Sequence, residues 1–151
     1  MIQRIQSLYL FVITILSVVV FFSPIVELTN GEISYILNYN GISLVTQPSE
    51  ILINTWTITV LSFFIPVIAA LALMSFKKRI LQIRLCIINM VLMIGFYPLV
   101  VIFIYFAQRL GLTYHLKFAI IFPLINAILT YLAIRAIGRD EALVHSLNRM
   151  R

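Results

Sequence analysis

Four long stretches of this chain contain no Asp, Glu, Lys, Arg or His. They cover residues 5–26, 51–76, 85–108 and 118–134, and they are 22, 26, 24 and 17 residues long. A helix needs about 20 apolar residues to cross the hydrocarbon core of a bilayer, and a lipid-exposed segment has to satisfy its backbone hydrogen bonds internally. The sequence therefore predicts four membrane-spanning helices.

The overall composition agrees with a membrane protein. Hydrophobic residues make up 62% of the 151 residues, whereas soluble domains contain roughly 45–50% apolar residues. We expect an all-α fold, with one four-helix transmembrane domain that spans residues 1–151. The predicted helices cover about residues 5–26, 51–76, 85–108 and 118–138, and they leave an exterior loop at 27–50 and a cytoplasmic tail at 139–151.

The eleven basic residues are distributed unevenly between the two sides of this bundle. Only Arg109 and Lys117 fall on the side opposite the termini. Because cytoplasmic segments are enriched in Lys and Arg, both termini are expected in the cytoplasm. The formal charge of +6 then reflects membrane topology, and no nucleic-acid partner is expected. The nine residues assigned to the cytoplasmic side are Arg4, Lys77, Lys78, Arg79, Arg84, Arg135, Arg139, Arg149 and Arg151.

The exterior loop carries a signal for tight turns. Asn30-Gly31 and Asn40-Gly41 separate short runs rich in Ile, Tyr, Val and Leu, and Asn-Gly is a favoured hairpin turn. We expect a small β-hairpin or meander of two or three strands in this loop. An isolated hairpin is marginal in water, so it should lean on the helix ends or on a partner.

Few polar side chains occur inside the predicted spans. Asn89, Asn126 and Thr130 are expected to make interhelical polar contacts, because an amide in hydrocarbon seeks a partner on another helix. Asn89 and Thr130 lie at similar depth in the cytoplasmic half, which makes them a plausible pair. Helix adhesion is the favoured role of these residues, and a transport path is the alternative.

The spans lack the residues on which catalysis and ion-coupled transport depend. Transporters mark their paths with intramembrane acids, bases or histidines, and none occurs here between the two interfaces. His115 and His145 are assigned to opposite sides, and the single Cys86 excludes an intramolecular disulfide. We therefore predict that the chain is not an enzyme, with no catalytic residue, cofactor or metal site.

One proline accompanies each predicted span: Pro24, Pro66, Pro98 and Pro123. A proline inside a membrane helix can bend it. Such a kink can open a cavity for a lipid or a small molecule. A small-molecule or lipid carrier is therefore the alternative to a purely structural role.

The tail has the pattern of a short C-terminal amphipathic helix. Leu143, Leu147 and Met150 follow the i, i+4, i+7 spacing of one helical face. Acidic residues begin the segment, and Arg149 and Arg151 end it, as the helix dipole favours. Such a helix either lies on the bilayer or holds a protein partner.

Three segments resemble a family of small four-helix membrane proteins of unknown function from Bacteroidota. They are residues 1–7 (MIQRIQS), 81–86 (LQIRLC) and 140–151 (DEALVHSLNRMR). Family members more usually have Arg and Asp where this chain has His145 and Asn148. The resemblance spans the whole chain and implies an inner-membrane tetraspan. It supplies no activity and no catalytic residue.

These observations together predict a non-enzymatic accessory or scaffold protein of the bacterial inner membrane. It would bind membrane lipids, and a protein partner or anionic lipid at its cytoplasmic face; the sequence does not define its oligomeric state. The expected contact residues are Arg4, Lys77, Lys78, Arg79, Arg84, Leu143, Leu147, Arg149 and Arg151.

Overall fold

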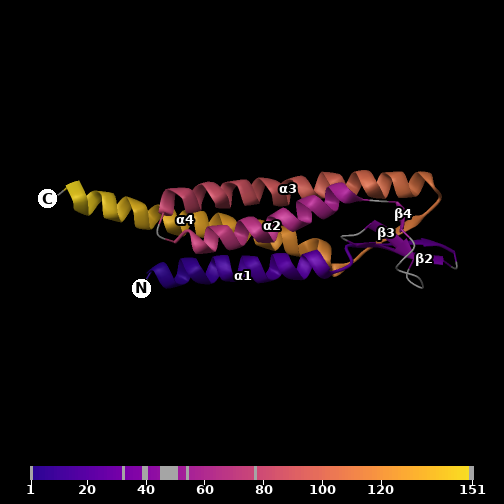
Figure 1. Cartoon of the computed structure of the whole chain (residues 1–151), viewed down its shortest axis with the longest axis horizontal. Coiled ribbons are helices and arrows are strands. Elements are labelled where there is room, and N and C mark those ends of the chain that lie inside the picture. The colour runs from indigo at the N-terminus through magenta and orange to yellow at the C-terminus, as the bar shows by residue number, and fades with distance from the viewer. Residues whose placement is uncertain are drawn as a thin grey trace.

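Four long helices and one antiparallel sheet make up the part of the chain that the computed structural model describes (Figure 1). That part omits residues 1, 32, 39–40, 45–50, 54, 77 and 150–151, and it covers the backbone alone for residues 2–6, 41, 51–53 and 140–149. The helices are α1 (Ile2–Phe22), α2 (Trp56–Met74), α3 (Arg79–Arg109) and α4 (Phe122–Arg149), with a 3₁₀ turn η1 (Phe118–Ile121) directly before α4.

The helices form an antiparallel bundle in which each packs against two neighbours, in the cyclic order α1, α2, α3, α4. The start of α1 and the end of α4 lie at the same end of the bundle, and the sheet lies at the other (Figure 1). We call the latter the sheet end. Small and flexible side chains fill the bundle interior, where Ala69, Cys86, Met93 and Ala133 are buried with Ile13.

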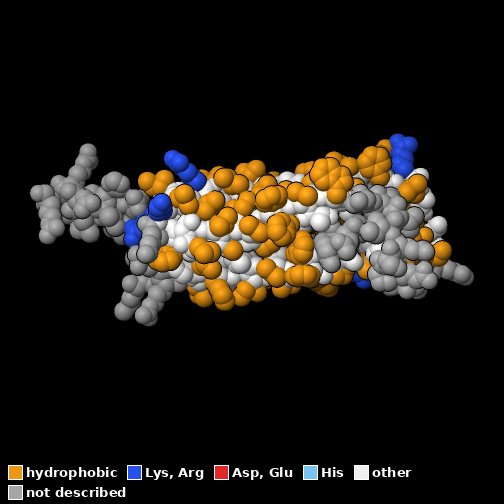
Figure 2. Space-filling view, viewed as in Figure 1, with side chains coloured by type: hydrophobic (Ala, Val, Ile, Leu, Met, Phe, Trp, Pro, Cys, Tyr) orange, Lys and Arg blue, Asp and Glu red, His pale blue; other side chains and the backbone are white. Residues whose placement is uncertain are grey.

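The outer surface of the bundle is apolar. Figure 2 shows hydrophobic side chains along its length, and basic side chains near its two ends. Three segments are long and apolar enough to cross a membrane: Trp56–Met74, Arg79–Arg109 and Phe118–Arg139. The described part of α1, Ser7–Phe22, is also apolar but shorter. This surface suits hydrocarbon better than water.

Five strands form the sheet, in the order β4-β3-β2-β1-β5. Neighbouring strands are antiparallel, with Leu28 opposite Tyr35 in β2 and Thr29 opposite Thr113 in β5. The turn from β1 to β2 uses Gly31 at φ 64°, a conformation that favours glycine. The strands are β1 (Val26–Asn30), β2 (Ile33–Asn38), β3 (Gly41–Leu44), β4 (Ile51–Ile53) and β5 (Thr113–Leu116).

The predicted all-α fold with only a hairpin or meander in the first loop was wrong. The chain forms a larger sheet, because two further segments pair with the expected meander. Ile51–Ile53 adds β4 beside β3, so α2 begins at Trp56 instead of residue 51. Thr113–Leu116, from the short link between α3 and α4, adds β5 beside β1.

The helical part also differs from the expectation in the tail, and its prolines occupy different positions within their helices. The predicted separate amphipathic helix of the tail is the last part of α4, which runs without a break to Arg149. Pro66 and Pro98 lie inside α2 and α3. Pro123 is the second residue of α4, where a missing backbone N–H costs little.

The sheet packs its apolar face against the bundle. Val26, Leu28 and Leu37 are buried together with Phe96 and Val100 of α3. Alternating strand residues point away from this core, as a sheet with one covered face requires. α3 is long enough to contribute to both the bundle interior and the core beneath the sheet.

The end of α3 directs the chain back toward β1. The backbone N–H of Leu112 donates to the carbonyl of Ala107 at 3.2 Å, and that of Gly111 donates to Gln108 at 3.0 Å. These two bonds are a Schellman motif, with Gly111 at φ 79° in the left-handed position that the motif requires. β5 follows after one residue, in position to pair with β1.

The pairing of β1 with β5 predicts a specific crosslink. Thr29 and Thr113 are opposite each other, with their hydroxyl oxygens 2.7 Å apart. In a Cys86→Ser background, Thr29→Cys with Thr113→Cys should form a disulfide under mild oxidation, because directly opposed residues fall within disulfide reach. Alkylation of the remaining free thiols, read as a gel shift, measures the yield.

The matched control combines Thr29→Cys with His115→Cys, two residues further along β5 on the same face. Diagonal Cβ atoms in a sheet lie up to about 7–8 Å apart, beyond disulfide reach. Equal crosslinking of the two pairs would contradict the register of β5.

Candidate functional site

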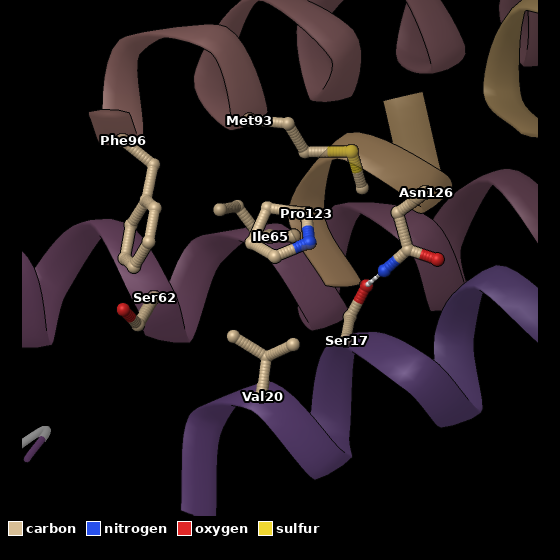
Figure 3. Close-up of a pocket in the computed structure, with 8 residues that line it drawn as sticks. All are labelled: Ser17, Val20, Ser62, Ile65, Met93, Phe96, Pro123 and Asn126. Atoms are coloured by element: carbon tan, nitrogen blue, oxygen red, sulfur yellow. Dashed lines mark hydrogen bonds between the residues drawn. The ribbon is translucent and has the colours of Figure 1, made fainter. Parts of the chain in front are cut away.

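A buried polar cluster joins α1 to α4 near the sheet end (Figure 3). The amide Nδ2 of Asn126 donates to Ser17 Oγ at 3.1 Å, and Ser17 Oγ donates to the carbonyl of Ile13 at 2.7 Å. Thr130 Oγ1 donates to the carbonyl of Asn126 at 2.7 Å, within its own helix. The exposed fractions of Asn126 and Ser17 are 1% and 3%. The cluster therefore fixes α1 against α4 inside the bundle.

A small cavity of about 10 Å³ lies beside this cluster. Ser62 Oγ and Asn126 Oδ1 are buried at it without a hydrogen-bond partner among the described residues. A cavity needs roughly 10–15 Å³ to hold one water molecule, so this one is too small for a lipid or a solute. Its lining residues are Ser17, Val20, Ser62, Ile65, Met93, Phe96, Pro123 and Asn126.

The structure does not bring Asn89 and Thr130 into a hydrogen bond. Thr130 uses its hydroxyl within α4, and the buried Oδ1 of Asn89 has no partner in the described part of the chain. The amide that does bond across helices is Asn126, and its partner Ser17 was missed by sequence reasoning.

A sequence signal for the Ser17 contact did exist. Ser17 lies five residues before the end of α1, and Asn126 lies four residues after the start of α4. At ~1.5 Å rise per residue both sit within about 8 Å of the sheet-end limit of their helices. In antiparallel neighbouring helices, residues at equal distances from the same end of the bundle lie side by side. Counting residues from the sheet end of α1 and α4 therefore pairs Ser17 with Asn126.

The end of the bundle opposite the sheet is basic. Lys78, Arg84, Arg135 and Arg139 are exposed there, and Arg79 is half-buried. The chain has no Asp or Glu between residues 51 and 139, so no carboxylate of this segment neutralises them. We call these five residues the basic end. The side chains of the other predicted contact residues lie outside the described part: Arg4, Lys77, Leu143, Leu147, Arg149 and Arg151.

An ion pair at the sheet end joins strand β1 to the residue that follows β5. Lys117 Nζ lies 2.5 Å from Glu27 Oε2. The hydrogen bond and the charge of Lys117 hold the pKa of the Glu27 carboxyl below its ordinary value of 4.5, and His115, opposite Glu27 in β5, contributes in the same direction. Glu27 is thus occupied by a cation from its own chain. The described residues contain no cluster of three metal-ligating side chains.

The Ser17–Asn126 contact gives a prediction that separates it from Asn89. Asn126→Leu and Ser17→Ala should each lower the free energy of unfolding, and the double variant should lose ~0.6 kcal/mol less than the sum, the average for such bonds. Asn89→Leu should be neutral or stabilising, because it replaces an amide with an unpaired oxygen by an apolar group. Reversible unfolding in mixed micelles measures all four variants. Additive losses at Ser17 and Asn126 would contradict the contact.

Comparison with known proteins assigns the chain to a family. No protein of curated function matches the chain. A family model described as a domain of unknown function, DUF4293, matches residues 2–150. This match confirms the resemblance to an uncharacterised family, and it covers nearly all of the 151 residues. The chain belongs to the DUF4293 family.

Proposed function

We propose that this protein is a four-span scaffold of the bacterial inner membrane, which binds a protein partner through the cytoplasmic end of α4. The membrane placement draws support from the three long apolar helices and from α1, whose 21 residues extend ~32 Å at ~1.5 Å per residue. That length matches the hydrocarbon core of about 30 Å. α1 also packs between α2 and α4, as a fourth span would.

The proposed orientation of the protein in the membrane follows from the distribution of its basic residues. Along the sequence, nine of the eleven basic residues lie in or near the two terminal segments and the α2–α3 link, and two lie near β5. The positive-inside rule then directs the basic end to the cytoplasm and the sheet to the exterior.

The observation that carries the scaffold role is the continuity of α4. Figure 1 shows α4 running beyond the start of α1, along the direction of the bundle. Its last ten residues, 140–149, extend ~15 Å at 1.5 Å per residue. An interfacial amphipathic helix lies in the plane of the bilayer. A helix that continues along a span instead points away from the membrane, where its Leu143 and Leu147 stripe meets a protein partner.

The basic end supports the same proposal in a second way. Four of its cations, Lys78, Arg84, Arg135 and Arg139, are exposed, and exposed basic side chains beside a membrane attract anionic headgroups. Lipid contacts there would fix the depth of the bundle and leave the end of α4 free for its partner. The cavity near Pro123 offers a carrier no comparable support, because its volume is about 10 Å³.

The orientation gives a direct prediction. In a Cys86→Ser background, Asn38→Cys should react with a membrane-impermeant maleimide in spheroplasts, because β2 lies at the exterior sheet end. Ser146→Cys should react only after the membrane is permeabilised. Labelling in the reverse pattern would invalidate both the orientation and the cytoplasmic scaffold.

The scaffold role predicts which residues of the tail bind the protein partner. Deletion of residues 140–151 should leave insertion intact but remove the protein partner crosslinked in native membranes. Leu143→Ser with Leu147→Ser should have the same effect, since a packed interface depends on its apolar stripe. Mass spectrometry of crosslinked material provides the measurement.

The matched control keeps that stripe and changes Arg149 and Arg151 to Gln. This variant should retain the protein partner, and any lipid attraction should weaken by about 1 kcal/mol per lost charge. Retention of every partner by the deletion variant would overturn the scaffold role.

A further inference from the structure

A surface groove runs between α3, β5 and η1 at the sheet end. Its volume is about 340 Å³, at the lower end of the range of about 300–1,000 Å³ that is usual for ligand pockets. Tyr97 donates its hydroxyl to the carbonyl of Ile120 at 2.9 Å, so the ring forms an apolar wall. The lining residues are Tyr97, Val100, Val101, Ile104, Tyr105, Gln108, Tyr114, Leu116 and Ile120.

The groove is amphiphilic along α3. Val100, Val101 and Ile104 line its deeper part, and Gln108 and the Tyr105 hydroxyl lie toward the end of the helix. The exposed fraction of Val101 is 62%, on a helix long and apolar enough to span a membrane. A molecule that fills the groove therefore needs an apolar part toward the bundle and a polar part toward the helix end.

Arg109 supplies a cation at the polar end of the groove. Its guanidinium carbon lies 5.1 Å from the centre of the Tyr105 ring, and its Nε and Nη2 donate to the Tyr105 hydroxyl. A guanidinium has five N–H donors, and this contact uses two of them. No carboxylate pairs with Arg109 in the described part of the chain. The remaining donors suit a phosphate, which guanidinium groups bind with matching geometry.

The depth of Arg109 agrees with a lipid phosphate. Arg84 and Arg109 are 25 positions apart on α3, which corresponds to ~38 Å of helix at 1.5 Å per residue. A bilayer is about 40–45 Å thick with its headgroups. With Arg84 at one headgroup layer, Arg109 lies close to the other, while Val101 lies about 12 Å deeper along the helix.

We propose that this groove binds one glycerophospholipid of the leaflet at the sheet end. Its phosphate contacts Arg109, and an acyl chain lies along Val101, Ile104 and Ile120. The proposal rests on the membrane placement above but not on the scaffold role, because the groove and the tail lie at opposite ends of the bundle. A protein helix would also fill an apolar groove, but a cation at one end of the groove, with no carboxylate partner among the described residues, fits a phospholipid.

The test counts bound lipid by native mass spectrometry of the full-length protein in detergent, titrated with palmitoyl-oleoyl phosphatidylglycerol. Arg109→Gln should weaken binding about fivefold, the effect of one basic side chain at a headgroup. Val101→Trp should weaken it at least as much by filling the groove. Diacylglycerol, which lacks the phosphate, should bind the wild type no better than it binds Arg109→Gln.

Two matched controls test the specificity of this site. Val91→Trp adds the same bulk on α3 at a residue of equal exposure, 60% against 62%, outside the groove. Lys117→Gln removes a cation at the same end, but one already paired with Glu27. Both should bind phosphatidylglycerol like the wild type. Equal binding by Arg109→Gln and wild type, or equal weakening in the controls, would overturn the site.

A partner crosslinking assay on Arg109→Gln separates this inference from the scaffold role. The variant should keep the partner that the tail deletion loses. Because Arg109 is exposed and bonded only to Tyr105 among the described residues, its substitution leaves the core intact, so loss of lipid cannot be assigned to misfolding.

Discussion

The hydrocarbon core of a bilayer leaves a backbone no partner except itself, and the rest of this architecture depends on that constraint. The long apolar segments are helical because a helix satisfies its own N–H and C=O groups. The sheet lies at one end of the bundle, where open strand edges meet water or headgroups. α3 connects the two parts: its 31 residues extend ~46 Å at 1.5 Å per residue, well beyond the ~30 Å of hydrocarbon. The surplus length carries Ala107 into the core beneath the sheet.

Strand β1 lies at the centre of the contacts that join the two links at the sheet end. It pairs with β2 from its own loop and with β5 from the link between α3 and α4. The Glu27–Lys117 ion pair joins the same two segments, and the N–H of Lys117 donates to the carbonyl of Ile25. A two-stranded hairpin is marginal in water. A sheet with one face packed on α3 is stabilised by apolar burial, and the helices at its ends hold its strands in register.

The sequence predicted the helices well and the sheet poorly, for physical reasons. A long charge-free stretch indicates a membrane-spanning helix, because only such a helix requires about 20 consecutive apolar residues. Ile51–Ile53 is apolar and continuous with α2, so its composition does not distinguish a strand from a helix start. Thr113–Leu116 is only four residues long, and its pairing with β1 is non-local. Asn126 was among the residues expected to bond across helices, but its partner Ser17 was missed because a nearly uniform apolar span does not reveal which residues of two neighbouring helices meet. The described basic residues lie near the two ends of the bundle, as expected if charge is excluded from hydrocarbon whatever the rotation of each helix.

Three buried polar residues in the interior of this bundle have a packing role. Ser17, Asn126 and Thr130 bond to one another or to their own helices, and the cavity beside them has the volume of about one water molecule. The ends differ in how their cations are compensated. At the sheet end Lys117 is neutralised by Glu27, and Arg109 rests on a tyrosine. At the basic end the described residues between 51 and 139 include five cations, and this segment has no carboxylate. Exposed basic side chains attract anions from their surroundings, and beside a membrane the most abundant anions are lipid phosphates. Lipid contacts at both ends would then set the depth of the bundle, and the continuation of α4 beyond the basic end would present the remaining apolar stripe at a fixed height above the bilayer.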